Sequence, residues 1–509
     1  MEAVDIEHNL VVIDEFDALS IEIHEPVQSF AKPDVKYPAK LHARKVAEGL
    51  GYQDGIIYLP GQDETNYEDS DQGPPFRQRR YFYYLTGADF PGCSVTYDIA
   101  ADKLTLWIPF TPPATILWFG NTPSPESCLA RSDVHDVQYT SGLGKYLRTR
   151  LSATKSLFVL RVSQLPVIDE FHALKPHLHI DVTSLQPIMD EARVIKSEYE
   201  IDMIRKANAV SSSAHRHVAQ NMYRWDNECQ IEASFTGHCT AQNAHAQSYP
   251  VIAGSGPNAS TLHYEANNEP LAGRQLVVLD AGTEWQCYAS DVTRTLPIGP
   301  KFSNEARSIY DLVHRMQEEC ISKIRPGVVF RDLQLHATLV AVKGLLQLGI
   351  LCGGSADEIF KNGTGAAFFP HGLGHHVGLD VHDVLSKDLL RPAGESMWGK
   401  RRPIGPHSVR AMIAQAGKSS SSSSLRFNTL RPNMIVTVEP GLYFCRPYIE
   451  AYFLRSEEHK KYIDTSVLEK YWDVGGVRIE DCVLVTEDGY ENLTTAPKGE
   501  ELLGILGVA

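Results

Sequence analysis

Five segments in the second half of the chain present side chains that commonly bind metal ions. They read QLVVLDAGTEW, CYASDVTRTLPIG, FFPHGLGHHVGLDVHD, MIVTVEPGLYF and GGVRIEDCVLVT. A carboxylate at the end of an apolar strand is costly to bury unless a cation or a hydrogen-bond donor pairs with it. Four carboxylates lie within or at the end of such strands, and together they predict an oxygen-rich metal site: Asp280, Asp291, Glu439 and Glu480.

The order of residues around these carboxylates suggests how they meet. The first two segments are close enough in the chain to form a hairpin, with Asp280 at a strand end and Asp291 in mid-strand. The two carboxylates would then repel each other, and a cation between them resolves the repulsion. In the last segment, strand alternation places Arg478 and Glu480 on one face, so both are expected to point into the same site.

The histidine-rich segment would add an imidazole ligand. His371 and His375 have the spacing of helical zinc ligands, but glycines between them disfavour a helix and the glutamate of an HExxH motif is absent. Alone, each of these signals is weak, because single strand-end aspartates and single histidines are more often solvated or structural. As a set, four carboxylates and one imidazole suit two divalent cations, Mn²⁺ first, with Co²⁺ or Zn²⁺ as alternatives.

The first part of the chain predicts a separate α/β domain. At 509 residues the chain is long enough for two or three domains. Residues 1–36 are expected to be a poorly ordered acidic extension. Residues 37–190 would form the smaller domain, with a helix at AKLHARKVAEGL and short strands at GIIYLPG, YFYYLTG, SVTYDIA, KLTLWIPF and KSLFVLR.

The second domain is predicted to span residues 191–505 and to begin with a long helix. Ser197 is a candidate N-cap, and apolar residues follow from Ile201 to Val218 at intervals of three and four. Residues 386–430 are rich in Arg, Pro, Gly and Ser and include six consecutive serines. Such low complexity does not build a core, so this segment is expected to be a flexible surface insertion.

Charge and cysteine usage exclude several classes of protein. With 63 acidic and 48 basic residues the net charge is −15, which argues against nucleic acid as a partner. The N-terminus lacks the features of a signal peptide, and no apolar stretch is long enough to span a membrane. Nine dispersed cysteines without a CxxC motif suit reduced thiols. A cytoplasmic location is expected.

The five segments together resemble those of a known family. LDAG, SDVTRT, PHGLGHHVGLDVHD, TVEPGLYF and GGVRIED are similar to the motifs of proline-specific metallopeptidases, the Xaa-Pro aminopeptidases and prolidases of the pita-bread fold. PFRQRRYFYYLTG, after KYPAK and HARKVAEGL, resembles the N-terminal part of the fungal members. The resemblance implies an α+β fold, in which the pita-bread catalytic domain follows a smaller α/β domain of the creatinase N-terminal type, which is ribonuclease-H-like.

The resemblance also implies individual roles for the metal ligands. Asp280 would bind one metal ion, whereas Asp291 and Glu480 would bridge both. His375 would be the sole imidazole ligand. Glu439 would be a ligand that also holds or deprotonates the bridging water, because two cations that share a water lower its pKa.

Four further residues match positions around the metal ions in the same family. His263, in STLHYEAN, would lie near the scissile carbonyl, and His382, in DVHD, would contact the substrate. Arg478 would orient the last ligand or hold substrate. His371 matches a family position without a definite role.

The resemblance predicts an Xaa-Pro aminopeptidase, which releases the residue before a penultimate proline. A strict Xaa-Pro dipeptidase is the first alternative, because its motifs are the same. A non-catalytic binding module on this fold is a remote one, since such relatives generally lose the ligands. Methionine aminopeptidase and creatine hydrolysis are disfavoured by the N-terminal domain and by the ligands. Expected partners are peptides with proline in the second position and a second subunit in a homodimer, with no nucleic acid and no membrane.

Overall fold

The computed structural model describes residues 35–507 except 121–122, 155, 168–177, 300–301, 391–402 and 417–426. The extension predicted for residues 1–36 therefore lies, up to residue 34, outside the described residues. The first part of the described chain holds α1 (Ala39–Leu50), β1 (Ile56–Pro60), α2 (Arg80–Thr86), β2 (Ser94–Asp98), β3 (Lys103–Ile108), α3 (Pro113–Phe119), α4 (Pro125–Arg131), β4 (Asp136–Tyr139), α5 (Leu143–Ala153), β5 (Ser156–Phe158), β6 (His179–Asp181) and α7 (Leu185–Val194).

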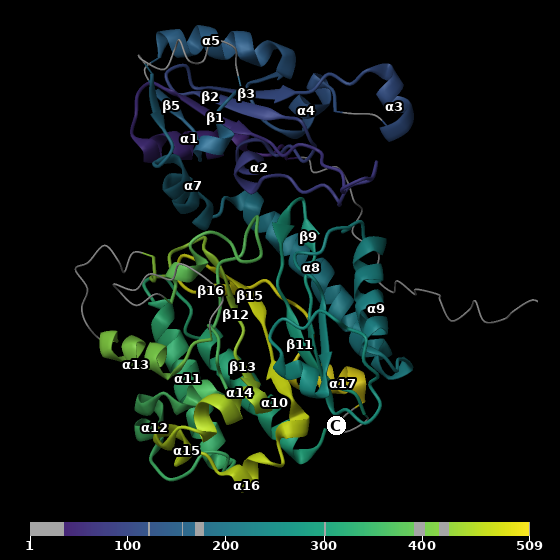
Figure 1. Cartoon of the computed structure of the whole chain (residues 1–509), viewed down its shortest axis with the longest axis vertical. Coiled ribbons are helices and arrows are strands. Elements are labelled where there is room, and N and C mark those ends of the chain that lie inside the picture. Colours follow the sequence, from purple (N-terminus) through teal and green to yellow (C-terminus); the bar gives the residue numbers. More distant parts are fainter. Residues whose placement is uncertain are drawn as a thin grey trace, which may run out of the picture. The chain divides into compact units, whose positions relative to one another are not determined.

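These strands form one mixed sheet in the order β4-β3-β2-β1-β5-β6 (Figure 1). Helix α5 covers one face, and α1, α2 and α7 cover the other. Strand β1 shows why: Ile56 and Tyr58 pack with Leu147 of α5, whereas Ile57 and Leu59 belong to the core on the opposite face. Successive side chains of a strand point to opposite faces, so β1 is apolar throughout because both faces are covered.

One predicted strand of this part is a helix. The segment YFYYLTG lies within α2, which spans Arg80–Thr86 and ends at Gly87. Gly87 has φ 66°, a left-handed conformation that glycine adopts without strain, and its N–H donates to the carbonyl of Tyr83 over 2.7 Å. Aromatic residues favour strands in general, but burial of nearly the whole segment decides its conformation here. The other four predicted strands are present as β1, β2, β3 and β5.

The second part holds the strands that position the candidate site. Its elements are α8 (Glu198–Asn221), α9 (Glu228–Ala241), β7 (Ile252–Ser255), β8 (Leu276–Asp280), β9 (Glu284–Trp285), β10 (Tyr288–Ala289), β11 (Thr293–Pro297), α10 (Asn304–Ile321), α11 (Phe330–Gln347), α12 (Ala356–Asn362), α13 (Pro406–Gln415), β12 (Ile435–Val438), β13 (Gly441–Tyr443), α14 (Arg446–Ile449), α15 (Glu457–Lys460), α16 (Thr465–Leu468), β14 (Gly476–Arg478), β15 (Asp481–Val485), β16 (Tyr490–Asn492) and α17 (Gly499–Leu506).

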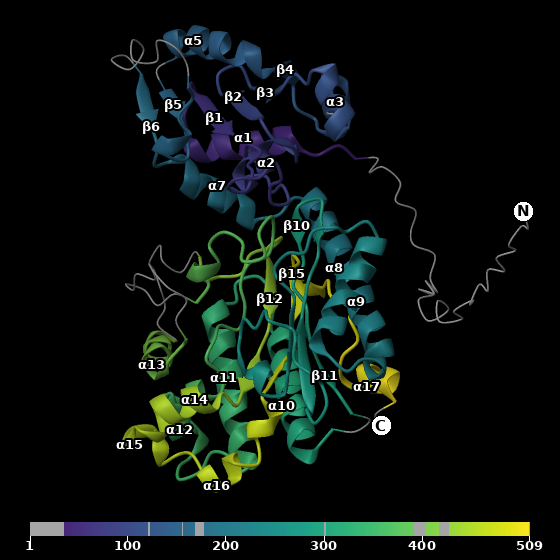
Figure 2. The same ribbon diagram turned by 45° about the vertical axis from the view of Figure 1, so that its right-hand side comes forward.

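Short antiparallel sheets lie between two pairs of helices, α8 with α9 and α10 with α11 (Figure 2). The sheets have the orders β11-β8-β7, β12-β15-β16, β13-β14 and β10-β9. Helix α8 begins as predicted: Ser197 caps it by accepting the N–H of Glu200, and the Glu200 carboxylate accepts the N–H of Ser197 in return. A single bridge between Thr293 and Glu480 links the β11 strand to the segment before β15.

Two further expectations for the second part are corrected. Asp291 does not lie in mid-strand, because it falls in the short irregular segment between β10 and β11. The insertion at 386–430 is not irregular throughout, since residues 406–415 form α13 and bury Val409 and Met412 in the core. The serine run, Ser419–Ser424, lies outside the described residues.

The two parts share apolar contacts. The core on the α1 face of the N-terminal sheet includes Ile201 of α8, Tyr288 of β10 and Leu484 of β15. All nine cysteines are free thiols, and six of them are buried. Among the helices of the described ranges, none has the length and apolarity required to cross a bilayer.

Candidate metal centre

The predicted ligands converge on one place. Three overlapping groups of side chains each bring their ligand atoms within 4.8 Å of one another, and all lie on or beside the strands of the second part. The overlap joins the groups into one continuous cluster. Their members are Asp280, Asp291 and Glu480 in the first group, His375, Glu439 and Glu480 in the second, and Asp291, His375 and His382 in the third.

Strand pairing brings the three most buried carboxylates together. Asp280, the last residue of β8, lies opposite Thr293 in the register of β8 with β11. Asp291 precedes this strand by two residues, and the bridge from Thr293 to Glu480 draws the third carboxylate to the same edge. The hydroxyl of Thr293 also donates to Glu480 Oε2 over 2.6 Å. A pairing between segments nearly 190 residues apart thus assembles this half of the site.

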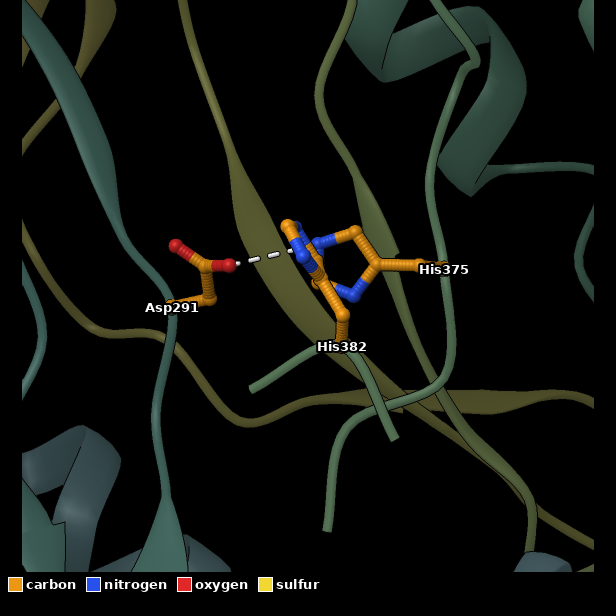
Figure 3. Close-up of side chains that lie close together, drawn as sticks. All are labelled: Asp291, His375 and His382. Carbon is orange, nitrogen blue, oxygen red and sulfur yellow. Dashed lines mark ion pairs between the residues drawn. The ribbon is translucent and has the colours of Figure 1, made fainter. Parts of the chain in front are cut away.

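His375 and Glu439 complete the cluster from a loop and a strand end. His375 Nε2 lies 3.2 Å from Asp291 Oδ2 and 3.3 Å from Glu439 Oε1. Figure 3 shows the His375 ring directed at Asp291, with the His382 ring beside it. The two ring centroids are 4.3 Å apart and nearly perpendicular. His382 therefore belongs to the cluster geometrically, although the resemblance assigned it to substrate contact.

The electrostatics of the cluster favour cations. Asp280, Asp291 and Glu480 expose only 9%, 5% and 1% of their surface. Burial, followed by the charge of neighbouring carboxylates, raises the pKa of Asp291, Glu439 and Glu480 well above the usual range. Among the described side chains, Asp280 Oδ1 and Glu480 Oε1 have no hydrogen-bond partner. Buried oxygens of this kind fit divalent metal ions, which would neutralise the carboxylates and use the unpaired oxygens.

A second ring of side chains supports this cluster. Arg478 Nη2 donates to Asp280 Oδ2 over 2.6 Å, and Nη1 donates to the Tyr443 hydroxyl over 2.8 Å. His371 Nε2 lies 2.8 Å from the same hydroxyl, and His371 Nδ1 is 3.9 Å from Glu439 Oε2. Burial, followed by the charge of Arg478, lowers the pKa of His371 to about 3.

The two histidines expected at the substrate lie at the surface. His263 follows the 3₁₀ turn Gly256–Ser260 and is exposed. A positive charge on His263 would lower the pKa of His371. His382 is exposed as well, on the loop after His375. Both are therefore accessible from solvent, whereas Asp280, Asp291 and Glu480 are buried.

Sequence reasoning missed residues that hold the ligands. Thr437 accepts the N–H of His375 over 3.0 Å and donates to Glu439 Oε1 over 3.3 Å. Thr293 and Tyr443 were within quoted motifs, and their positions two and four residues from a ligand are the signal that could have found them. Tyr249 has no such signal, although a side-chain hydrogen bond from it lowers the pKa of Asp291 against the larger effect of burial.

Two family models match most of the chain. The model of "Metallopeptidase family M24" matches residues 202–487, and that of "Aminopeptidase P, N-terminal domain" matches residues 40–159. A probable Xaa-Pro aminopeptidase from Colletotrichum graminicola is 53% identical over 99% of both chains. Another, from Metarhizium acridum, is 51% identical over 98% of this chain and 99% of that one.

Solved structures give the same fold. Zinc-substituted aminopeptidase P of E. coli in complex with product superposes with a TM-score of 0.71 at 25% identity, over 92% of this chain and 97% of that one. The E. coli enzyme with the inhibitor Pro-Leu gives the same values. The architecture is thus the pita-bread fold preceded by the aminopeptidase P N-terminal domain, and the chain belongs to metallopeptidase family M24.

Proposed function

We propose that the chain is an Xaa-Pro aminopeptidase in which five residues hold two divalent cations. The overlap of the three ligand groups is the observation that supports the assignment, because it places all five proposed ligands in one cluster. The activity is supported by full-length relatives named as probable Xaa-Pro aminopeptidases at about half identity. The proposed ligands are Asp280, Asp291, His375, Glu439 and Glu480.

The donor set supports Mn²⁺ as the native ion, with Co²⁺ or Zn²⁺ as alternatives. Four carboxylates and one imidazole form an oxygen-rich site with a ligand charge that balances two divalent cations. Asp291, His375 and Glu480 each belong to two of the groups, and of these only the two carboxylates have two oxygens with which to bridge two ions. When bound, the ions would polarise the scissile carbonyl and lower the pKa of a water molecule.

The side chains around the ions have separate tasks in this proposal. Glu439, held by Thr437, accepts the proton of the attacking water at a carboxylate oxygen and passes it to the departing nitrogen. His263 and His382 donate hydrogen bonds to the substrate from the exposed rim of the site. Arg478 keeps Asp280 oriented, and His371 holds the Tyr443 hydroxyl beside Arg478.

Peptides with proline in the second position are the proposed substrates. The proline nitrogen has no hydrogen and its ring fixes the backbone, so a site shaped for this ring accepts bonds that other peptidases reject. The names of the relatives favour the aminopeptidase over a strict dipeptidase. A homodimer and a cytoplasmic location are also proposed, the latter because nine free thiols suit a reducing compartment.

Peptide digestion tests the activity and its metal dependence together. The substrates are Xaa-Pro, Xaa-Pro-Yaa and Xaa-Ala-Yaa, each with Mn²⁺ and again after chelation. Release of the first residue from Xaa-Pro-Yaa but not from Xaa-Ala-Yaa, only with metal, is the expected result. Cleavage of Xaa-Pro alone would instead identify a dipeptidase, and no cleavage with bound metal would favour a binding module.

Ligand variants test the residues. Asp291→Asn and Glu480→Gln should each abolish Mn²⁺-dependent cleavage and lower the metal content of the purified protein. Asp98→Asn is the matched control, because Asp98 is a buried carboxylate of β2 that pairs with Arg150 over 2.6 Å. Unchanged cleavage in the two ligand variants would refute the proposed ligand set.

A further inference from the structure

One backbone carbonyl oxygen, that of His376, contacts both ends of the loop that contains His375 and His382. The carbonyl of His376 accepts the N–H of Asp383 over 2.9 Å, and His375 Nδ1 lies 3.1 Å from the same oxygen. A carbonyl oxygen only accepts hydrogen bonds, so Nδ1 of His375 must bear the proton. The other nitrogen, Nε2, is then left with its lone pair, and it is the atom that faces Asp291 and Glu439.

The side chain of Asp383 fixes this end of the loop through two buried ion pairs. Asp383 is 3% exposed, with Oδ1 2.6 Å from Arg193 Nη2 and Oδ2 3.0 Å from Lys196 Nζ. Both cations are themselves 2% exposed. Burial alone would raise the pKa of Asp383, but Arg193 and Lys196 hold it down to about 2. The cluster is thus a buried, charged unit in which each carboxylate oxygen has one cation.

A glycine makes room for this ion cluster. A Cβ atom at Gly378 would lie 2.2 Å from Asp383 Oδ2 and 3.2 Å from Lys196 Cε. The first distance is far below van der Waals contact, so a larger residue would displace the carboxylate. Gly378 also binds the loop to the strands, because its carbonyl accepts the N–H of Ala289 over 2.8 Å.

The cations come from outside the matched catalytic region. Arg193 and Lys196 lie between residues 40–159 and 202–487, the ranges of the two family models. Arg193 also contacts Asp380 Oδ2 over 3.0 Å, and Arg77 contacts Asp380 Oδ1 over 3.1 Å. Residues that precede α8 therefore hold the loop at two carboxylates.

We propose that Asp383, clamped by Arg193 and Lys196, is a positioning residue for His375. The clamp fixes the loop backbone, the His376 carbonyl orients the imidazole, and the imidazole presents Nε2 to the metal. Partners of this kind behind a metal-bound histidine typically change metal affinity by about 10–100-fold when they are removed. The inference rests on the proposed role of His375 as a metal ligand.

Metal affinity tests the clamp directly. Asp383→Asn and Lys196→Met would be titrated with Co²⁺ and Mn²⁺ against a competing chelator, and the visible absorption of the Co²⁺-loaded proteins recorded. Dissociation constants about 10–100-fold above wild type, with an altered Co²⁺ spectrum, are expected. Lys196→Arg, which keeps the cation, should recover most of the affinity. The control Asp98→Asn removes a buried carboxylate far from the loop in sequence and should bind within about twofold of wild type.

Thermal unfolding distinguishes a loss of metal affinity from a general loss of stability. Lys196→Met leaves the pair of Arg193 with Asp383 intact and is therefore the variant expected to fold if Asp383→Asn does not. Wild-type affinity and spectrum in folded Lys196→Met, with only a lowered Tm, would overturn the inference. Failure of wild type itself to bind metal would instead refute the proposed function.

Discussion

Arg478 holds one oxygen of Asp280 and leaves the other to the metal centre. Its Nη2 lies 2.6 Å from Asp280 Oδ2, while Asp280 Oδ1 has no hydrogen-bond partner among the described residues. The same guanidinium binds the Tyr443 hydroxyl, which also contacts His371. One arginine thus links a metal-ligand candidate to two side chains on the opposite strand and loop.

Arg478→Met should weaken metal binding and catalysis together. The substitution removes the donor that orients Asp280 and the cation that offsets the buried carboxylates, so we expect metal affinity to fall by about 10–100-fold. Calorimetric metal titration and kcat/KM on an Xaa-Pro-Yaa peptide would measure both. Arg478→Lys keeps the charge but not both contacts. Its metal affinity and kcat/KM should therefore lie between those of wild type and Arg478→Met. Undiminished affinity in the methionine variant would contradict this role.

Divalent cations should stabilise the folded protein. The carboxylates repel one another without metal, and ligands that bind only the native state add about 2.7 kcal/mol per site at 100 times the Kd. Thermal unfolding with Mn²⁺ and after chelation would give the increment as a rise in Tm. Glu480→Gln should lose most of that rise, whereas Asp98→Asn should keep it. Equal Tm values for wild type with and without metal would argue against the site.

Glu228 should be necessary for the loop that contains His263. This fully buried carboxylate accepts the N–H and hydroxyl of Ser255, over 2.8 and 2.6 Å, and the hydroxyl of Tyr264 over 2.8 Å. Arg274 Nη1 lies 3.3 Å from Glu228, and Arg274 Nη2 lies 3.2 Å from Glu269, so removing Glu228 takes away one of the two carboxylates that pair with this guanidinium.

Glu228→Ala is therefore expected to lower the free energy of unfolding by about 3–5 kcal/mol, because several donors lose their acceptor at once. It should also raise KM, because His263 lies between Asn258 and Tyr264, which Glu228 holds. Urea unfolding and peptide kinetics would measure the two effects. The control Glu500→Ala removes a carboxylate that is 87% exposed and should change neither. Normal stability in the Glu228 variant would exclude the network as a structural element.

Acid should destabilise the protein partly through His215. Burial, followed by the charge of Arg294, lowers the pKa of His215 to about 4, while Nε2 donates to the Ala281 carbonyl over 3.0 Å. The unfolded state binds the proton at higher pH than the native state does. The stability from this histidine is therefore complete above about pH 6.5 and is lost as the pH falls toward 4.

Between pH 7 and 5 this loss amounts to about 2 kcal/mol. Urea unfolding at both pH values should show a smaller difference for His215→Phe than for wild type, by about that amount. His179→Phe, at an exposed position, should keep the wild-type difference. An unchanged pH dependence in the His215 variant would mean that another group is responsible.

Helices and strands could be predicted from the sequence where apolar residues recur at a regular interval. The cap at Ser197, the apolar face of α8, and the carboxylates that end β8 and follow β12 were all predictable. Helix α2 was not, because an aromatic run favours a strand locally and only packing on both sides decides otherwise. Helix α13 was not predicted either, because the composition of the segment around it gave no sign that it packs into the core.

The sequence by itself determined which residue types are available for the metal centre and their order in the chain. Only the tertiary structure decided that they meet. The bridge from Thr293 to Glu480 and the contact of Arg478 with Asp280 each join segments nearly 200 residues apart. The clamp of Asp383 by Arg193 and Lys196 likewise depends on a loop that folds back on a distant helix end. Periodicity reports the burial of neighbours in the chain, whereas such contacts depend on how whole strands and loops pack.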